Sequence, residues 1–237
     1  YDKRVVYATY DVTDYFSTGS NAFGILLGNG WYSLPTRDVF GMHDANWHTP
    51  PKVRLNVVVE YESGARDVIV TDRTWKWGHG EIVYNSVRSG ETIDHTKSVH
   101  GWNEPGFCDS LWRNVCHVPA PLGKLTADPM PPMRVAKELK PVGITETGPG
   151  VYLVDFGENL TGWVETRVRG SRGQTVELQF NEVLKADGSL NTQNSTWHTR
   201  GRYQTELLIL GGDGEETFEP RFTYHGFRYM QVRGLAY

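Results

Sequence analysis

The chain has 237 residues, of which 38% are hydrophobic and 12% aromatic, and this length suits one large β domain or two ordinary ones. The formal net charge is −4 and the 24 Lys and Arg residues are scattered, so no basic field is available for a nucleic acid. No apolar run approaches the roughly 20 residues that a membrane span needs, so we expect neither a nucleic acid nor a membrane as partner.

Short strands between turns are predicted over the first half of the chain. Val5–Tyr10 and Phe23–Leu27 are the first two, and Asp11–Phe16 carries helix-capping residues that predict a single helical turn. Val53–Tyr61 alternates apolar and polar residues, and a Gly-containing turn leads from it into Asp67–Thr71. This spacing and turn chemistry predict a β-hairpin.

The segment 118–149 differs in composition from the regions on either side. Its first half holds five prolines in two short runs, which predicts an extended crossover rather than a packed element. Beyond it, strands divided by Gly-containing turns are predicted at Val151–Asp155, Gly162–Val168, Thr175–Phe180, Tyr203–Leu210 and Phe227–Val232. No stretch sustains a helical period for three turns.

The sequence therefore predicts an all-β protein. We expect two β-sandwich or jelly-roll-like domains, at 1–117 and 150–237, joined by the Pro-rich crossover 118–149.

Several motifs carry a family resemblance over nearly the whole chain. In the first domain they are Tyr10–Asp14, Leu26–Tyr32, Gly90–Asp94 and Gly101–Phe107; in the second they are Val151–Val164, Glu182–Leu184 with Asp187–Ser189, and Glu216–Val232. Together and in this order they resemble the N-terminal and second β-domains of bacterial α-L-rhamnosidases, which are glycoside hydrolases.

The resemblance has consequences for function. It implies a parent enzyme that hydrolyses terminal α-L-rhamnose with inversion, with its catalytic residues on a helical barrel that follows these domains. Because this chain shows no such barrel, we assign it no catalytic residue. We expect a non-catalytic β region without the family's first strands, whose partners are that barrel and rhamnose-containing glycans, in an extracellular or periplasmic location.

The segment after Gly90 is the best candidate for a binding site. Glu91 and Asp94 are hard oxygen ligands of the kind that Ca²⁺ accepts, and Ca²⁺ has coordination left over for vicinal sugar hydroxyls. Because some family members bind rhamnose with calcium in this domain, the resemblance implies a sugar site at Glu91, Asp94, His95, Trp102 and Asn103, with Ca²⁺ held by Glu91 and Asp94. The alternative is that these carboxylates are structural hydrogen-bonders.

Four tryptophans lie in segments predicted to be loops, where an indole can stack on the apolar face of a pyranose: Trp31, Trp47, Trp102 and Trp112. The alternative is that an indole fills a core and donates its N–H to the backbone.

Three alternative functions stay open at this stage: a free-standing lectin-like module, a purely structural scaffold, and hydrolysis through Asp155 or Glu182. The last is the weakest, because an acidic residue at a strand end or turn is commonly a hydrogen-bonder. Cys108 and Cys116 are too few for a disulfide framework or a zinc site, and they could form at most one local bridge.

Overall fold

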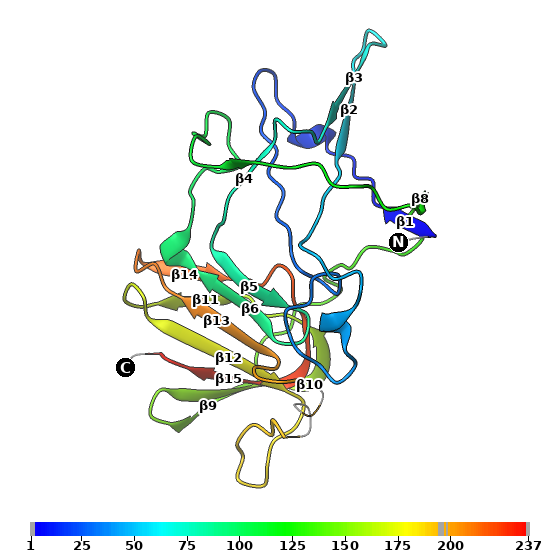
Figure 1. The fold of residues 1–237 in the computed structure, drawn as a ribbon. Coiled ribbons are helices and arrows are strands. Elements are labelled where there is room, and N and C mark those ends of the chain that lie inside the picture. Colours follow the sequence, from blue (N-terminus) through cyan, green and yellow to red (C-terminus); the bar gives the residue numbers. More distant parts are fainter. Residues whose placement is uncertain (1–2, 194–196, 198, 236–237) are drawn as a thin grey trace. The chain divides into compact units, whose positions relative to one another are not determined.

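The computed structural model describes residues 3–193, 197 and 199–235, and over these residues the protein is built from strands (Figure 1). The only helical elements there are three short 3₁₀ turns, η1 (Thr13–Tyr15), η2 (Met42–Asp44) and η3 (His95–Lys97). The predicted all-β class is confirmed. No helix in the described part of the chain is long and apolar enough to cross a membrane.

The chain forms two compact units that interleave along the sequence. Unit 1 comprises Tyr1–Ile25, Val53–Gly78 and Gly101–Glu138, and unit 2 comprises Leu26–Lys52, His79–His100 and Leu139–Tyr237. The sequence patterns predicted contiguous domains instead, at 1–117 and 150–237. The difference arises because residues 92–94 pair with residues 207–209 and Asp38 forms an isolated bridge with Thr199, and local patterns record neither contact.

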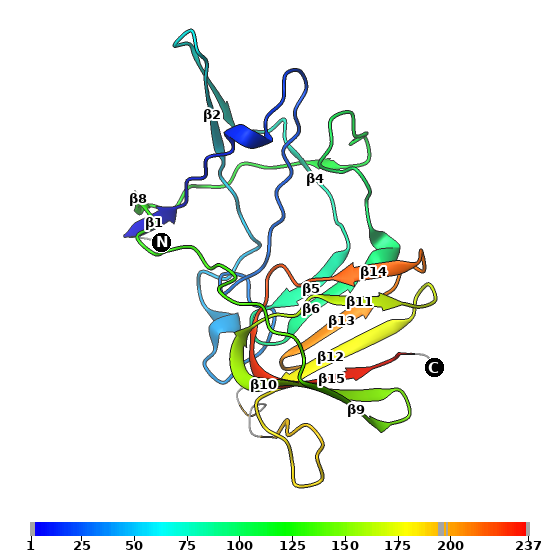
Figure 2. The same cartoon turned by 180° about the vertical axis from the view of Figure 1, so that it is seen from behind.

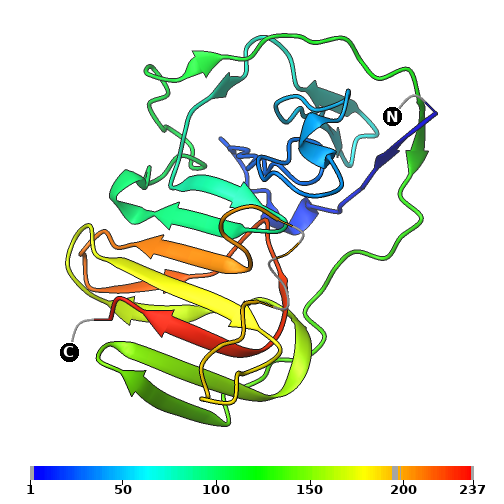
Figure 3. The ribbon, with the colours of Figure 1, turned by 60° about the horizontal axis from the view of Figure 1, so that its bottom comes forward.

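Unit 2 contains a seven-stranded mixed sheet in the order β5-β6-β13-β12-β15-β10-β9 (Figures 1 and 3). Its strands are β5 (Ile82–Ser86), β6 (Gly90–Asp94), β9 (Gly143–Gly148), β10 (Val151–Gly162), β12 (Thr175–Asn181), β13 (Thr205–Ile209) and β15 (His225–Arg233). Strand β6 runs parallel to β13, with Thr92 opposite Leu207 and Ile93 opposite Leu208, whereas the other neighbours are antiparallel.

A second layer, β11 (Thr166–Arg169) paired with β14 (Glu215–Phe218), lies across one face of this sheet (Figure 2). The alternation in β12 explains why the second layer covers this face, because Val176, Leu178 and Phe180 are apolar and buried there. One hydrophobic core joins the two layers: Ile93, Val154, Phe156, Val164, Val168, Val176, Leu178, Phe180, Leu208, Leu210, Phe218, Phe227, Met230 and Val232. This arrangement is a β-sandwich.

Unit 1 contains three separate strand pairs. They are β1 (Arg4–Tyr7) with β8 (Lys124–Ala127), β2 (Asn56–Glu60) with β3 (Arg66–Val70), and β4 (Lys76–Trp77) with β7 (Arg113–Asn114). Among the described residues of unit 1, Val57 is the only one whose side chain is buried.

Several predicted strand boundaries are corrected by the structure. Phe23–Leu27 is not a strand, and β8 lies inside the segment that was predicted to be an unpacked crossover. β10 continues through residues 156–162, beyond the strand predicted at Val151–Asp155, because the chain bulges between Asp155 and Leu160 instead of turning back. Gly157 permits this bulge with a φ of +83°. The two cysteines are free, exposed thiols.

Candidate functional site

Glu91 holds a backbone loop in unit 2. Its side chain is completely buried, with an exposed fraction of 0%. The amides of Arg221 and Phe222 each donate to one of its carboxylate oxygens at 3.1 Å. The Glu91 amide in turn donates to Glu206. Glu91 thus satisfies two backbone amides of the loop before β15.

Glu206 continues this buried polar network. Its Oε1 accepts from the Thr223 hydroxyl at 2.7 Å and lies 2.5 Å from Nε2 of His225. Burial raises the pKa of Glu91 to about 7, and the charge of Glu206 adds to the rise, whereas the two amide hydrogen bonds oppose it. No local sequence pattern indicates Glu206 or His225, because Glu206 lies 115 positions from Glu91 and His225 lies 19 positions from Glu206.

Asp94 and His95 bond to other partners. Asp94 accepts from the Thr96 amide at 3.1 Å, which caps η3, and pairs with Lys97 at 2.8 Å; these contacts, the Lys97 contact first, lower the pKa of Asp94. Nδ1 of His95 lies 2.6 Å from Oε2 of Glu216. Asp94 and His95 therefore stabilise the turn after β6.

The structure does not bring Glu91 and Asp94 to a common vacant position. Both oxygens of Glu91 accept backbone amides, and Asp94 is engaged by Thr96 and Lys97. Across the residues that the structure describes, no group of three or more His, Cys, Asp or Glu side chains could hold a metal ion. The two carboxylates do not fit a shared Ca²⁺ as they stand, and calcium binding there stays a prediction that requires these contacts to open.

Trp102 and Asn103 belong to unit 1, whereas the three acidic and His positions of the predicted site belong to unit 2. The Trp102 ring packs so closely on Gly24 that a Cβ there would lie 2.2 Å from it. Trp102 also stacks on Trp112 with ring centroids 6.4 Å apart, and Phe107 meets Trp112 edge-on at 5.4 Å. Trp102 thus belongs to an aromatic cluster inside unit 1. Asn103 is exposed.

Asp155 is held in a fixed ion pair. Nε and one terminal nitrogen of Arg228 each donate to a different oxygen of Asp155 at 2.9 Å, and the Gly157 amide donates to Oδ1 at 2.7 Å. The Arg228 contact lowers the pKa of Asp155. Glu182, the residue after the end of β12, is exposed. A carboxylate fixed by Arg228 is a poor general acid, because its ionised form is favoured.

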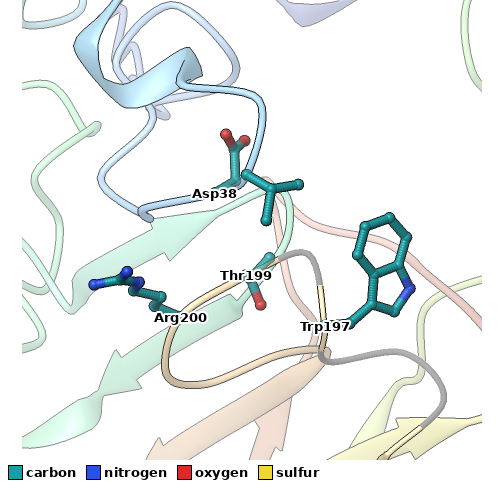
Figure 4. Close-up of a pocket in the computed structure, with 5 residues that line it drawn as sticks. Asp38, Trp197, Thr199 and Arg200 are labelled. Atoms are coloured by element: carbon teal, nitrogen blue, oxygen red, sulfur yellow. The ribbon is translucent and has the colours of Figure 1, made fainter.

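A pocket of about 300 Å³ lies in unit 2 and is lined by Asp38, Val39, Trp197, Thr199 and Arg200 (Figure 4). Asp38 and Thr199 face each other in an isolated antiparallel bridge. The Thr199 hydroxyl is buried and has no hydrogen-bond partner in the described part of the chain. No local sequence pattern indicates this pocket, since its walls come from segments about 160 positions apart.

Two family models match the chain. The α-L-rhamnosidase N-terminal domain matches residues 1–137, and the bacterial α-L-rhamnosidase concanavalin-like domain matches residues 145–237. The chain belongs to the α-L-rhamnosidase family. The resemblance predicted from the sequence motifs is confirmed.

Known α-L-rhamnosidases resemble the chain along almost its full length. The enzyme of Streptomyces avermitilis is 40% identical over 236 residues, which cover 99% of the chain and 22% of that protein. One from Formosa agariphila is 32% identical over 242 residues, covering 100% of the chain and 25% of that protein. The chain therefore spans about a quarter of the length of these rhamnosidases.

Solved rhamnosidase structures share the fold. The α-L-rhamnosidase of Dictyoglumus thermophilum superposes with a TM-score of 0.86 at 38% identity, covering 98% of the chain and 25% of that structure. The S. avermitilis α-L-rhamnosidase, solved in complex with L-rhamnose, gives a TM-score of 0.85 at 38% identity and covers 100% of the chain and 22% of that structure. The chain thus corresponds to the N-terminal β region of rhamnosidase-like proteins.

Proposed function

We propose that the chain is the non-catalytic β region of an α-L-rhamnosidase-like glycoside hydrolase and that it serves as structural support. The parent protein hydrolyses terminal α-L-rhamnose, and its chemistry takes place on a helical barrel outside this chain. The carboxylates described above support a non-catalytic role. Inverting hydrolysis needs one carboxyl to donate a proton and another to activate water. Glu91, Asp94, Asp155 and Glu206 instead hold amides, cations or hydroxyls of the fold.

The observation that carries the structural role is the exposed apolar surface of unit 1. In β3, Val68, Ile69 and Val70 are all exposed, and Val58 of β2 is exposed as well. Strands with apolar residues on both faces are typical of positions that are covered on both sides. Exposed apolar area of this kind marks a surface that packs against other protein. We propose that further parts of the parent protein, including the barrel, cover it.

Two measurements on the purified chain test this proposal. We expect no release of aryl alcohol from an aryl α-L-rhamnoside above buffer, and turnover that vanishes in Asp155→Asn or Glu182→Gln would show a catalytic chain instead. In hydrogen exchange, amides of β2 and β3 should exchange much faster than those of β12 and β15, because they lack a packed core. Equal protection from exchange in β2–β3 and in β12–β15 would argue against the proposal that other parts of the parent protein must cover β2 and β3.

Sugar binding is the second candidate, and the first ligand to test is rhamnose, since a similar solved rhamnosidase was determined with L-rhamnose bound. The test is calorimetric titration of the chain with L-rhamnose, first with Ca²⁺ and then with excess chelator. Saturable binding that is lost with chelator and in Asp94→Ala, but kept in Lys97→Met, would identify a calcium-dependent rhamnose module. If the folded chain gives no binding heat in either condition, the structural role remains as the proposal.

A further inference from the structure

The wall of the pocket beside Asp38 is rigidly built. The Asp38 side chain is fully enclosed, its Oδ1 accepts from the amides of Phe40 at 3.0 Å and Met42 at 3.2 Å, and its Oδ2 accepts from Nε of Arg88 at 3.2 Å. The guanidinium carbon of Arg88 lies 5.0 Å from the centroid of Trp31 and 5.2 Å from that of Phe40. Because these contacts are made by the protein's own groups, little further ordering of this wall would accompany binding.

Two arginines lie opposite each other beside the same bridge. Asp38 lies opposite Thr199, and the Arg200 amide donates to the Arg37 carbonyl at 3.0 Å, so Arg37 and Arg200 leave the backbone on the same side. Both are exposed, and neither forms an ion pair with any described residue. Like charges directly opposite each other are unfavourable. A bound anion would offset this repulsion.

The pocket also presents a large aromatic surface. Trp197 lines it and has an exposed fraction of 69%. Figure 4 shows the Trp197 and Arg200 side chains extending on opposite sides of Thr199. A volume of about 300 Å³ is at the lower end for ligand pockets and holds roughly one sugar ring. A ligand that contacts both side chains must therefore be longer than one ring.

We propose that this face binds an acidic oligosaccharide, with one sugar ring stacked on Trp197 and the carboxylate of the adjoining sugar held by Arg200 and Arg37. A planar guanidinium binds a carboxylate through paired, charge-assisted hydrogen bonds. An indole offers a broad apolar surface to the C–H face of a pyranose. This site is independent of the support role and of the predicted calcium site, because it shares no residue with either.

The test is calorimetric titration of the whole chain with cellobiouronic acid, a glucuronate linked to glucose, and with its neutral twin cellobiose. We expect saturable binding of the acid that is at least about tenfold tighter than that of cellobiose, and Trp197→Ala, Arg200→Met and Arg37→Met should each weaken it about tenfold. Trp47→Ala and Arg134→Met remove an exposed indole and an exposed guanidinium elsewhere and should leave the affinity unchanged.

Free glucuronate and sodium sulfate complete the experiment. Both should bind more weakly than the disaccharide, because neither reaches the indole and the two arginines together. Equal affinity for sulfate would reduce the face to a simple anion site and overturn the sugar assignment. Equal affinity for cellobiose, full affinity in Arg200→Met, or no binding by folded chain would each overturn the proposal. The three altered side chains are exposed, so far-ultraviolet circular dichroism, which reports the backbone, should show an unchanged fold.

Discussion

Gly90→Ala tests whether the parallel pairing of β6 with β13 organises unit 2. Gly90 has a φ of +100°, and a Cβ built there would lie 2.2 Å from the Thr205 carbonyl oxygen and 2.7 Å from its carbon. Because these are backbone atoms, no rotamer change relieves the overlap. β6 would have to move away from β13, which would disturb the burial of Ile93 and the Glu91 contacts to the loop before β15.

The magnitude follows from a matched comparison. Gly173 has a φ of +81°, and a Cβ there meets nothing within 4 Å, so Gly173→Ala carries backbone strain alone, about 1 to 2 kcal/mol. Gly90→Ala carries similar strain plus the backbone overlap, so we expect a loss of about 3 to 5 kcal/mol. Urea unfolding followed by far-ultraviolet circular dichroism measures both. A loss for Gly90→Ala no larger than that for Gly173→Ala would show that the overlap with the Thr205 backbone costs no stability.

Three further predictions concern unit 2. Phe227→Ala should lower the free energy of unfolding by about 3 to 5 kcal/mol in denaturant titration, because the ring is completely buried against Phe156 and Phe180. The folded-state pKa of Glu91 is raised to about 7 from 4.5, so the free energy of unfolding falls by about 3 kcal/mol as pH rises from 4.5 to 7. Glu91→Gln should remove this decline when stability is measured against pH. A stability–pH profile that stays the same in the variant would contradict this prediction. The folded-state pKa of Asp155 is lowered, so its contribution to the free energy of unfolding is present above pH 3.8 and is lost as pH falls below that value. The difference in stability between the parent chain and Asp155→Asn should therefore shrink in acid. A difference that stays constant with pH would contradict this prediction.

Much of the secondary structure could be predicted from neighbouring residues. The 3₁₀ turn at Thr13–Tyr15, the hairpin of β2 and β3, and strand β12 all form close to their predicted positions. In β12 the alternating Val176, Leu178 and Phe180 directly specify a buried face. These predictions succeeded because the deciding interactions lie within a few residues along the chain.

The candidate site was predictable only in part. The burial of Glu91 depends on Arg221 and Phe222, which are 130 and 131 positions away, and no pattern around Gly90 records them. The same holds for the bridge that joins Asp38 to Thr199 and forms the pocket. A carboxylate after a glycine has the same local sequence whether it faces solvent or closes a core.

Local patterns along the chain were enough to predict the all-β class, the hairpin of β2 and β3 and, through the motifs, membership of the α-L-rhamnosidase family. Only the folded chain shows that β6 pairs with β13, that Glu91 accepts amides of the loop before β15, and that Trp102 packs inside unit 1. The physical reason is that alternation and turn chemistry act over a few residues, whereas strand pairing and burial depend on segments that meet only when the chain folds.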